Sequence, residues 1–253
     1  MNMEGYKKKI AYKFNKASKN YDQYSKFQRE CGNNLCKLTG CIIQSKLLDA
    51  GCGTGLFSRY WKSFNNQVIA LDISYGMLEQ AKRRNSANIY ILGDIENSPL
   101  IDKTVDIIFS NLAIQWCNDF SRALSELYRI LRPGGFLVLS TLIKGSLIEL
   151  KQSSKNIDNC SNVNCFLPIS SIYNALSPYR YKLINKIKSF YYSSVLDLLK
   201  DIKGVGSSYL YDRNNLGLRS KKYLNDLEKF WPYHNKKGFK LSYNVVYGII
   251  YRD

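Results

Sequence analysis

Residues 47–55 read Leu-Leu-Asp-Ala-Gly-Cys-Gly-Thr-Gly, and residues 68–72 follow as Val-Ile-Ala-Leu-Asp. An apolar run ends in Asp49, three glycines come at alternate positions, and a second apolar run ends in Asp72. Glycines let a turn adopt dihedrals that a side chain forbids, and they let the backbone approach a ligand closely. An acid at the end of the next strand can accept hydrogen bonds from ribose hydroxyls. The stretch therefore predicts a nucleoside-cofactor site in a doubly wound sheet.

The glycine spacing indicates which cofactor to expect. A dinucleotide fingerprint is G-x-G-x-x-G, but here the spacing is G-x-G-x-G and Leu56 stands at the place of that third glycine. No Gly-Lys-Ser/Thr follows, which excludes a phosphate-binding P-loop. The D-x-G-x-G-x-G form with Asp72 downstream resembles motif I of class I methyltransferases, and this resemblance implies S-adenosylmethionine as the cofactor.

Strands and helices alternate along the hydrophobic pattern. Short apolar runs predict strands at 46–49, 67–72, 89–92, 105–110 and 136–141, and later at 182–192 and 241–251. Helices are expected over 7–40, from Ser74, over 123–131, and after the glycine loop, where one face carries Leu56, Phe57, Tyr60, Trp61 and Phe64. We therefore expect an α/β, Rossmann-like class I methyltransferase fold. Its sheet is mostly parallel and seven-stranded with an antiparallel last strand, and N-terminal and late inserted helices form a cap.

The 253 residues suffice for one sizeable core. We expect a single domain over 1–253, in which 1–40 form cap helices, 46–141 the cofactor-binding core, and 142–253 the substrate-side insertions and final strand pair. The N-terminus does not read as a signal peptide, and no apolar run approaches the roughly 18 to 20 residues of a membrane span. These features predict a cytoplasmic protein without a membrane partner.

Seven cysteines contain no C-x-x-C pair, and His234 is the single histidine. Cys31, Cys36 and Cys41 step by five, which spreads them around a helix. We therefore expect no metal site and instead free, buried thiols in a reducing compartment; the other four are Cys52, Cys117, Cys160 and Cys165. A serine hydrolase is also disfavoured, because no G-x-S-x-G motif accompanies His234.

The net charge of +17 has two interpretations. It can serve an acidic macromolecular partner, or it can reflect compositional drift in a chain rich in Lys, Asn, Ile and Tyr. The basic residues are scattered without one dominating block, so charge alone does not decide between them.

Ligands of open α/β sheets bind beyond the carboxyl ends of the strands. This rule places Gly51, Gly53, Asp72, Asp94 and Asn111 around one crevice. We expect Asp72 to bind the ribose, Asp94 beside Ile95 to bind the adenine amine, and Ile73 and Met77 to sandwich the base. Asp49 is expected to order the glycine loop and the methionine end of the cofactor through hydrogen bonds. Asn111 and Gln115 are expected near the methyl group. The alternatives are that Asp94 only forms a turn and that Asn111 only caps the segment after its strand.

A narrower resemblance extends over nearly the whole chain. The segment Ser-Asn-Leu-Ala-Ile-Gln-Trp-Cys-Asn-Asp at 110–119 resembles the motif after the fourth strand in the malonyl-acyl-carrier-protein O-methyltransferases of biotin synthesis. The first helical segment and the Leu-Lys-Asp-Ile-Lys-Gly-Val-Gly stretch at 199–206 are similar to that family, as are the final-strand residues 241–248. Residues 145–180 match poorly.

The resemblance implies methyl transfer from S-adenosylmethionine to the free carboxylate of a malonyl thioester. The partner would be an acidic acyl carrier protein, or coenzyme A, and no nucleic acid is expected. A malonyl carboxylate, with a pKa near 3.9 as for Asp, is already ionised at neutral pH and needs no general base. Candidates for positioning the substrate are Tyr21, which we expect to close over the cofactor, Gln115, Trp116, Arg29 and Arg180.

Three other functions remain open. The chain could methylate another small carboxylate or a quinone precursor, or it could methylate RNA, as its basic charge invites. The Asn/Asp-Pro-Pro-aromatic motif of adenine methylation is missing after the fourth strand, where Asn111-Leu112-Ala113 stands. A third alternative is a binding module without catalysis, which the intact Gly51, Gly53, Asp72 and Asp94 disfavour.

Overall fold

A computed structural model describes residues 3–40, 42–158, 165–206 and 221–253. The strands are, in chain order, β1 (Lys46–Ala50), β2 (Gln67–Asp72), β3 (Ile89–Leu92), β4 (Val105–Asn111), β5 (Leu131–Leu142), β6 (Arg180–Tyr192), β7 (His234–Asn235) and β8 (Gly238–Tyr251). The helices are α1 (Met3–Ala17), α2 (Tyr21–Tyr24), α3 (Lys26–Thr39), α4 (Leu56–Lys62), α5 (Tyr75–Arg83), the 3₁₀ turn η1 (Ile114–Trp116), α6 (Phe120–Ile130), α7 (Ile148–Asp158), α8 (Ile169–Leu176), α9 (Val195–Gly204) and α10 (Lys221–Lys229).

Seven strands form one sheet in the order β3-β2-β1-β4-β5-β8-β6, and the two-residue β7 pairs with β8. Strands β1 to β5 pair in parallel, whereas β8 is antiparallel to both β5 and β6. The expected mostly parallel sheet with an antiparallel last strand is therefore confirmed. The switch in strand order lies between β1 and β4, which is where such sheets bind ligands.

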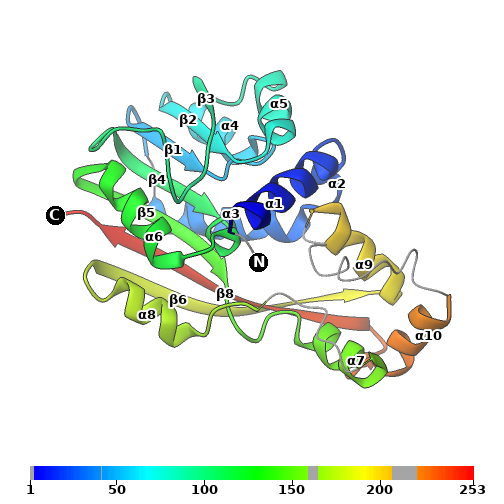
Figure 1. Ribbon diagram of the computed structural model, residues 1–253. Helices are drawn as coiled ribbons and strands as arrows, with labels where there is room; N and C mark the ends of the chain where they lie inside the picture. Colours follow the sequence, from blue (N-terminus) through cyan, green and yellow to red (C-terminus); the bar gives the residue numbers. More distant parts are fainter. Residues whose placement is uncertain (1–2, 41, 159–164, 207–220) are drawn as a thin grey trace.

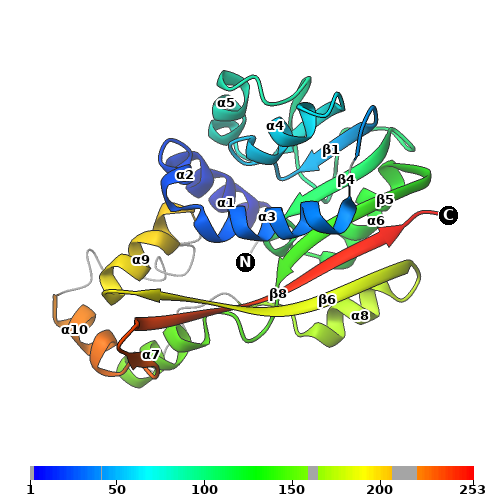
Figure 2. The ribbon, with the colours of Figure 1, turned by 180° about the vertical axis from the view of Figure 1, so that it is seen from behind.

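Helices cover both faces of the sheet (Figures 1 and 2). On one face, α3, α4 and α5 bury Leu35, Trp61 and Leu78 in a first core cluster. On the other face, α6 and α8 bury Leu124 and Ile172 in a second cluster. Burial of such side chains contributes about 1.5 to 3 kcal/mol each, which fixes the sheet as a rigid platform.

The prediction of one buried face on the helix after the glycine loop is wrong in part. Trp61 is 1% exposed, but Leu56 and Tyr60 are each 42% exposed, and Phe64 lies beyond the end of α4 at Lys62. Residues four apart share a helix face, so Phe57 and Trp61 turn to the sheet together while Leu56 and Tyr60 turn to solvent.

The cysteines of the described residues are free thiols, as expected. Cys31 and Cys52 are buried, and Cys36 and Cys117 are partly buried, whereas Cys165 is exposed in the connection before α8 and corrects the expectation of burial. Cys41 and Cys160 lie outside the described residues.

Within the described ranges, no group of acidic, Cys or His side chains could hold a metal ion. None of the described helices is both long and apolar enough to cross a membrane.

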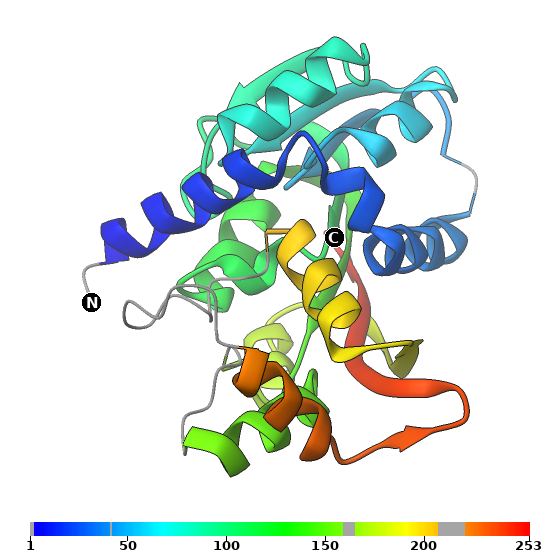
Figure 3. The same cartoon turned by 90° about the vertical axis from the view of Figure 1, so that its right-hand side faces the viewer.

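The expected N-terminal helical segment consists of three helices rather than one. Helix α1 packs against α5, and the short α2 packs against α9, so that the first helices lie across the carboxyl ends of the strands (Figure 3). The close approach of α2 to α9 depends on Gly204, because a Cβ there would lie 2.2 Å from the Tyr24 ring. This contact gives the Lys-Gly-x-Gly segment at 203–206 a structural role.

Candidate active site

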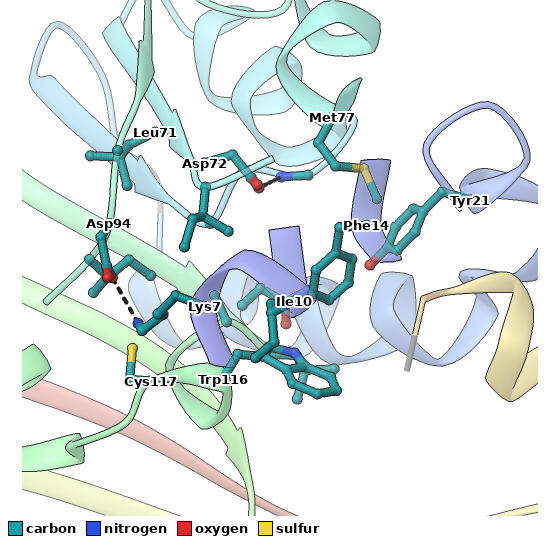
Figure 4. A pocket seen from close by; sticks show the side chains of 18 residues that line it. Lys7, Ile10, Phe14, Tyr21, Leu71, Asp72, Met77, Asp94, Trp116 and Cys117 are labelled. Atoms are coloured by element: carbon teal, nitrogen blue, oxygen red, sulfur yellow. Dashed lines mark hydrogen bonds and ion pairs between the residues drawn. The ribbon is translucent and has the colours of Figure 1, made fainter. Parts of the chain in front are cut away.

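A cleft of about 630 Å³, partly open to solvent, lies at the carboxyl ends of β1, β2 and β4. Figure 4 shows side chains converging on it from the sheet and from α1 and α2. The structure brings most of the predicted cofactor residues into its lining, namely Tyr21, Gly51, Gly53, Asp72, Ile73, Met77, Asp94, Ile95 and Asn111. One predicted cofactor residue, Asp49, lies behind it.

The glycine loop has the backbone that its sequence predicts. Gly51 has φ 80°, and a Cβ there would lie 2.2 Å from the Ala113 Cβ. A left-handed conformation combined with so close a contact admits only glycine without rearrangement. The bare backbone therefore forms the floor of the cleft between β1 and η1.

Asp72 stands at the centre of the cleft. Its Oδ2 accepts a hydrogen bond of 2.8 Å from the Gly53 N–H, and its Oδ1 accepts one of 2.8 Å from the Ser74 N–H. Burial raises the pKa of Asp72 to about 6, against these bonds, which lower it. The Ile73 N–H is a third backbone donor to this carboxylate. A carboxylate has about four lone-pair sites, so capacity remains for a further donor such as a ribose hydroxyl.

Asp94 has a partner that the sequence pattern does not reveal. Lys7 of α1 donates to Asp94 Oδ1 at 2.8 Å and also pairs with Glu96 (Figure 4). Burial opposes the charge of Lys7, but Cys117, Asp94 and Glu96 raise its pKa overall. Lys7 therefore stays cationic and fixes α1 over the cleft, while Asp94 Oδ2 remains for an amino donor.

Two further polar contacts hold the first helices over the cleft. Asn15 Oδ1 accepts hydrogen bonds from Ser74 Oγ at 2.8 Å and from the Gly76 N–H at 2.6 Å. Thr54 Oγ1 donates to Asp22 Oδ1 at 2.7 Å. Each contact involves a residue next to one that lines the cofactor cleft. The position of the first helices therefore depends on the geometry of the cleft.

Asp49 lies beneath the glycine loop and does not line the cleft, so its contact with the methionine end of a cofactor is indirect at most. It is 2% exposed, and Ser58 Oγ of α4 donates to its Oδ2 at 2.6 Å. Burial raises the pKa of Asp49 to about 7, Ser58 opposes this rise, and the charge of Asp72 adds to it. Asp49 thus ties β1 to α4 around the loop.

We expect the free energy of unfolding to fall as the pH rises from about 4 to about 7, and Asp49→Asn to reduce this slope. An unfolded Asp titrates near pH 3.9, whereas folded Asp49 titrates at about 7. The folded state therefore binds the extra proton in that window and is favoured at its acid end, by on the order of 4 kcal/mol. Urea unfolding at about pH 5 and about pH 7.5 measures the slope. Asp253→Asn, at the exposed C-terminus, is the control, and equal slopes in both variants would refute the assignment.

A second cavity, with about 790 Å³ of space including its opening to solvent, adjoins the cleft. Four side chains line both spaces, namely Phe14, Tyr21, Leu112 and Trp116. The rings of Phe14 and Trp116 meet edge to face at 5.5 Å. These residues therefore form the partition between the two spaces.

The second cavity is mainly aromatic. Phe27 of α3 stacks on Tyr243 of β8 at 3.9 Å, and Phe190 of β6 meets both rings. Tyr192 and Asp201, which also line it, are hydrogen-bonded to one another. Such a chamber excludes water around a small, partly polar ligand.

Asn111 and Gln115 both have structural partners. Asn111 lines the cleft and donates to the Gln28 carbonyl at 2.9 Å, and its Oδ1 accepts from Ser140 Oγ at 2.8 Å. Gln115 lines the second cavity, and its Oε1 accepts from the Leu142 N–H at 2.9 Å. These hydrogen bonds fix the end of β4 beside both spaces, and they orient the amide of Gln115 toward β5.

The two arginines proposed to bind a carboxylate line neither space. Arg29 donates to the Asp22 carbonyl at 2.6 Å and braces α2 against α3. Arg180 begins β6, whereas the cavity-lining Phe190 and Tyr192 lie near its other end. Its side chain is 66% exposed and pairs with Asp253 at 3.0 Å. The expectation that Arg180 positions the substrate is corrected, because this residue lies at the end of β6 away from the cavity. The same expectation for Arg29 is corrected, because its guanidinium donates to a backbone carbonyl of α2.

Comparison with known proteins agrees with this geometry. A family model described as a methyltransferase domain matches residues 48–139. The chain is 45% identical over 251 residues to a malonyl-[acyl-carrier protein] O-methyltransferase of Pectobacterium atrosepticum, and the alignment covers 99% of each chain. It is 43% identical over 251 residues to the protein of that name from Yersinia pestis, covering 98% of this chain and 92% of the relative.

Solved structures share the fold. The YcgJ protein of Bacillus subtilis superimposes with a TM-score of 0.61 at 18% identity, covering 89% of this chain and 99% of that one. A putative methyltransferase of Bacillus halodurans gives a TM-score of 0.61 at 18% identity, covering 87% of this chain and 97% of that one.

Proposed function

The chain belongs to the malonyl-[acyl-carrier protein] O-methyltransferase family, and we propose that it methylates the free carboxylate of a malonyl group carried as a thioester on an acyl carrier protein. It is an S-adenosylmethionine-dependent methyltransferase with the class I fold. The methyl ester produced would enter pimeloyl and biotin synthesis, as the resemblance implies.

The residues of the cleft fit S-adenosylmethionine, which supplies the electrophilic methyl group when bound. We assign the ribose to Asp72, whose carboxylate keeps capacity for a hydroxyl donor beside its three backbone partners. Asp94 would accept from the adenine amino group, and the apolar Ile73, Met77 and Ile95 would enclose the base, since all three line the same space. Gly51 and Gly53 would approach the cofactor with their backbone, and Asp49 would act only by ordering their loop.

The partition between the two spaces is the observation that carries the proposal. A methyl donor in the cleft and an acceptor in the aromatic cavity would meet at Phe14, Tyr21, Leu112 and Trp116. Alignment of two reactants at such a junction provides roughly 7 to 11 kcal/mol of the barrier reduction. Tyr21, Gln115 and Trp116 would position the acceptor from this junction and its cavity side.

The chemistry requires no general base. A malonyl carboxylate with a pKa near 3.9 is ionised at neutral pH, so it would take the methyl group from bound S-adenosylmethionine without first losing a proton. The electron pair of the carbon–sulfur bond would stay on sulfur. Exclusion of water by Phe27, Phe190 and Tyr243 would raise the reactivity of that carboxylate. Tyr21 can donate a hydrogen bond to it, because burial, with Asp72 and Asp22 nearby, raises the pKa of the phenol and keeps it protonated.

Expectations about the carrier, the domain organisation and the cellular location depend on the same substrate assignment. We propose that the carrier protein rather than coenzyme A presents the malonyl group, that residues 1–253 act as one domain with 1–40 as its cap, and that the enzyme works in the cytoplasm without a nucleic-acid partner. The carrier protein in the names of the relatives supports the first of these.

Intact-mass spectrometry of malonyl-acyl carrier protein, incubated with the enzyme and S-adenosylmethionine, tests the proposal. We expect a gain of one methyl group that an esterase reverses, and no gain on acetyl-acyl carrier protein, which lacks a free carboxylate. No gain on the malonyl form, with cofactor binding confirmed by calorimetry, would refute the substrate. Other small carboxylates, quinone precursors and RNA would then be the acceptors to assay.

A further inference from the structure

One face of the edge strand β6 is strongly basic. Side chains alternate between the two faces of a strand, and one face carries Lys182, Ile184, Lys186 and Lys188 before it reaches Phe190 and Tyr192. The last two line the aromatic cavity. The strand therefore presents a row of cations that leads into the cavity lining.

Contacts establish which way this face points. Lys188 pairs with Glu30 of α3 at 2.5 Å, and Phe190 meets Phe27 of α3 at 5.9 Å. The alternate residues Tyr181 and Leu183 pack into the core cluster of α6 and α8 on the opposite side. The basic row thus lies on the α3 side of the sheet, which Figure 2 shows from the front.

The described part of the chain leaves two lysines on this face without an ion pair. Lys182 and Lys186 are exposed, and no ion pair involves them among residues 3–40, 42–158, 165–206 and 221–253. Glu30 is already engaged by Lys188. Ile184, between the two lysines, is 40% exposed. Two free cations that flank an apolar side chain are suited to contact with an acidic protein surface.

The row is also within reach of the site. With a rise of about 3.3 Å per residue, Lys186 lies about 20 Å from Tyr192 along the strand. At the cavity end, the exposed Lys26 lines the second cavity and lies over the Phe190 ring, with its Nζ 5.8 Å from the ring centroid. A protein seated on the strand could therefore deliver an extended thioester arm past Lys26 into the aromatic cavity.

We propose that the acidic carrier protein docks on the α3-facing side of β6, over Lys182, Ile184 and Lys186, and threads its malonyl thioester past Lys26. This inference rests on the proposed function and assigns the surface for its partner. It also gives part of the +17 net charge a use.

Charge reversal with a matched control tests the docking surface. K182E/K186E and the control K82E/R83E, on the exposed last turn of α5, change the net charge equally. We expect K182E/K186E to lower kcat/KM for malonyl-acyl carrier protein about tenfold or more at low salt, through KM and with kcat unchanged. The dependence of KM on salt should become shallower. The control should behave as the wild type, and both variants should keep wild-type melting curves and cofactor affinity.

Two results would overturn the proposal: an unchanged KM in K182E/K186E, or an equal rise in the control, which would assign the effect to net charge alone. Calorimetric titration of the three proteins with the carrier protein measures docking without turnover. If the wild type binds the carrier through these lysines but methylates no malonyl thioester, the proposed function fails and the surface stands. Loss of RNA binding in place of carrier binding would mark the face as a nucleic-acid surface and refute the proposal.

Discussion

Asp72→Ala is expected to weaken S-adenosylmethionine binding by about 10-fold to 10²-fold. A hydrogen bond to a charged group contributes about 1.5 to 3 kcal/mol, so loss of one bond to a ribose hydroxyl corresponds to about 10-fold to 10²-fold in affinity. The variant also loses the acceptors that hold the N–H groups of Gly53 and Ser74 at 2.8 Å each. Isothermal titration calorimetry of the purified enzyme measures the effect.

The pH dependence of the same affinity gives an independent test of Asp72. Burial raises the pKa of Asp72 to about 6, so in the wild type the affinity should decrease as the pH falls through 6 and the carboxylate takes up a proton. Asp72→Asn should bind weakly with little change across this range. Asp102→Asn, on an exposed carboxyl paired with Arg129, is the control. Wild-type affinity in a folded Asp72→Ala protein would contradict the assignment.

The cofactor half of the molecule could be predicted from sequence because its signals are local. Asp49 and Asp72, near the ends of their strands, and the glycines after Asp49 lie within one unit of strand, glycine loop, helix α4 and strand. Such a unit has one stereochemical solution, in which backbone and carboxylate face the same crevice. The rule that ligands bind beyond the carboxyl ends of the strands then added Asp94 and Asn111, which the structure brings to the same space.

Polar partners across the first helix could not be predicted. Lys7 reads as one of several surface lysines in a basic N-terminal segment, but folding places it against Asp94 and Glu96. Periodicity reports which face of a helix is apolar and gives no information on which strand end it meets. Asp49 is the converse case, because its side chain turns to Ser58 behind the loop although its position in the motif suggests the cleft.

The aromatic cavity was beyond sequence reasoning for a related reason. Phe27, Phe190 and Tyr243 come from α3, β6 and β8, and their rings meet only because β8 inserts between β5 and β6. Arg180 was a candidate from the sequence, but it begins β6, whereas the residues of β6 that line the cavity lie near the other end of the strand. Substrate-side residues of this fold depend on long-range pairing that local patterns do not encode.

Tyr21→Ala is expected to lower kcat by about 10²-fold while the protein stays folded. Tyr21 lines both the cleft and the aromatic cavity, so its loss would join the two spaces, admit water and loosen the alignment of donor and acceptor. A misplacement of about 1 Å costs on the order of 10²-fold in rate. Single-turnover assays with malonyl-acyl carrier protein separate this effect from cofactor binding, which should weaken less than turnover.

Tyr21→Phe separates the ring from its hydroxyl. The phenylalanine keeps the partition closed but cannot donate a hydrogen bond to the malonyl carboxylate, a loss of about 0.5 to 3 kcal/mol and hence of roughly tenfold in turnover. Tyr12→Ala, on the preceding helix α1 and 65% exposed, controls for removal of a tyrosine and should leave the kinetics unchanged. If Tyr21→Phe and Tyr21→Ala both retain wild-type turnover and cofactor affinity, Tyr21 does not close the site. If Tyr21→Phe alone matches the wild type, the ring acts by excluding water and the hydroxyl has no part in orienting the carboxylate.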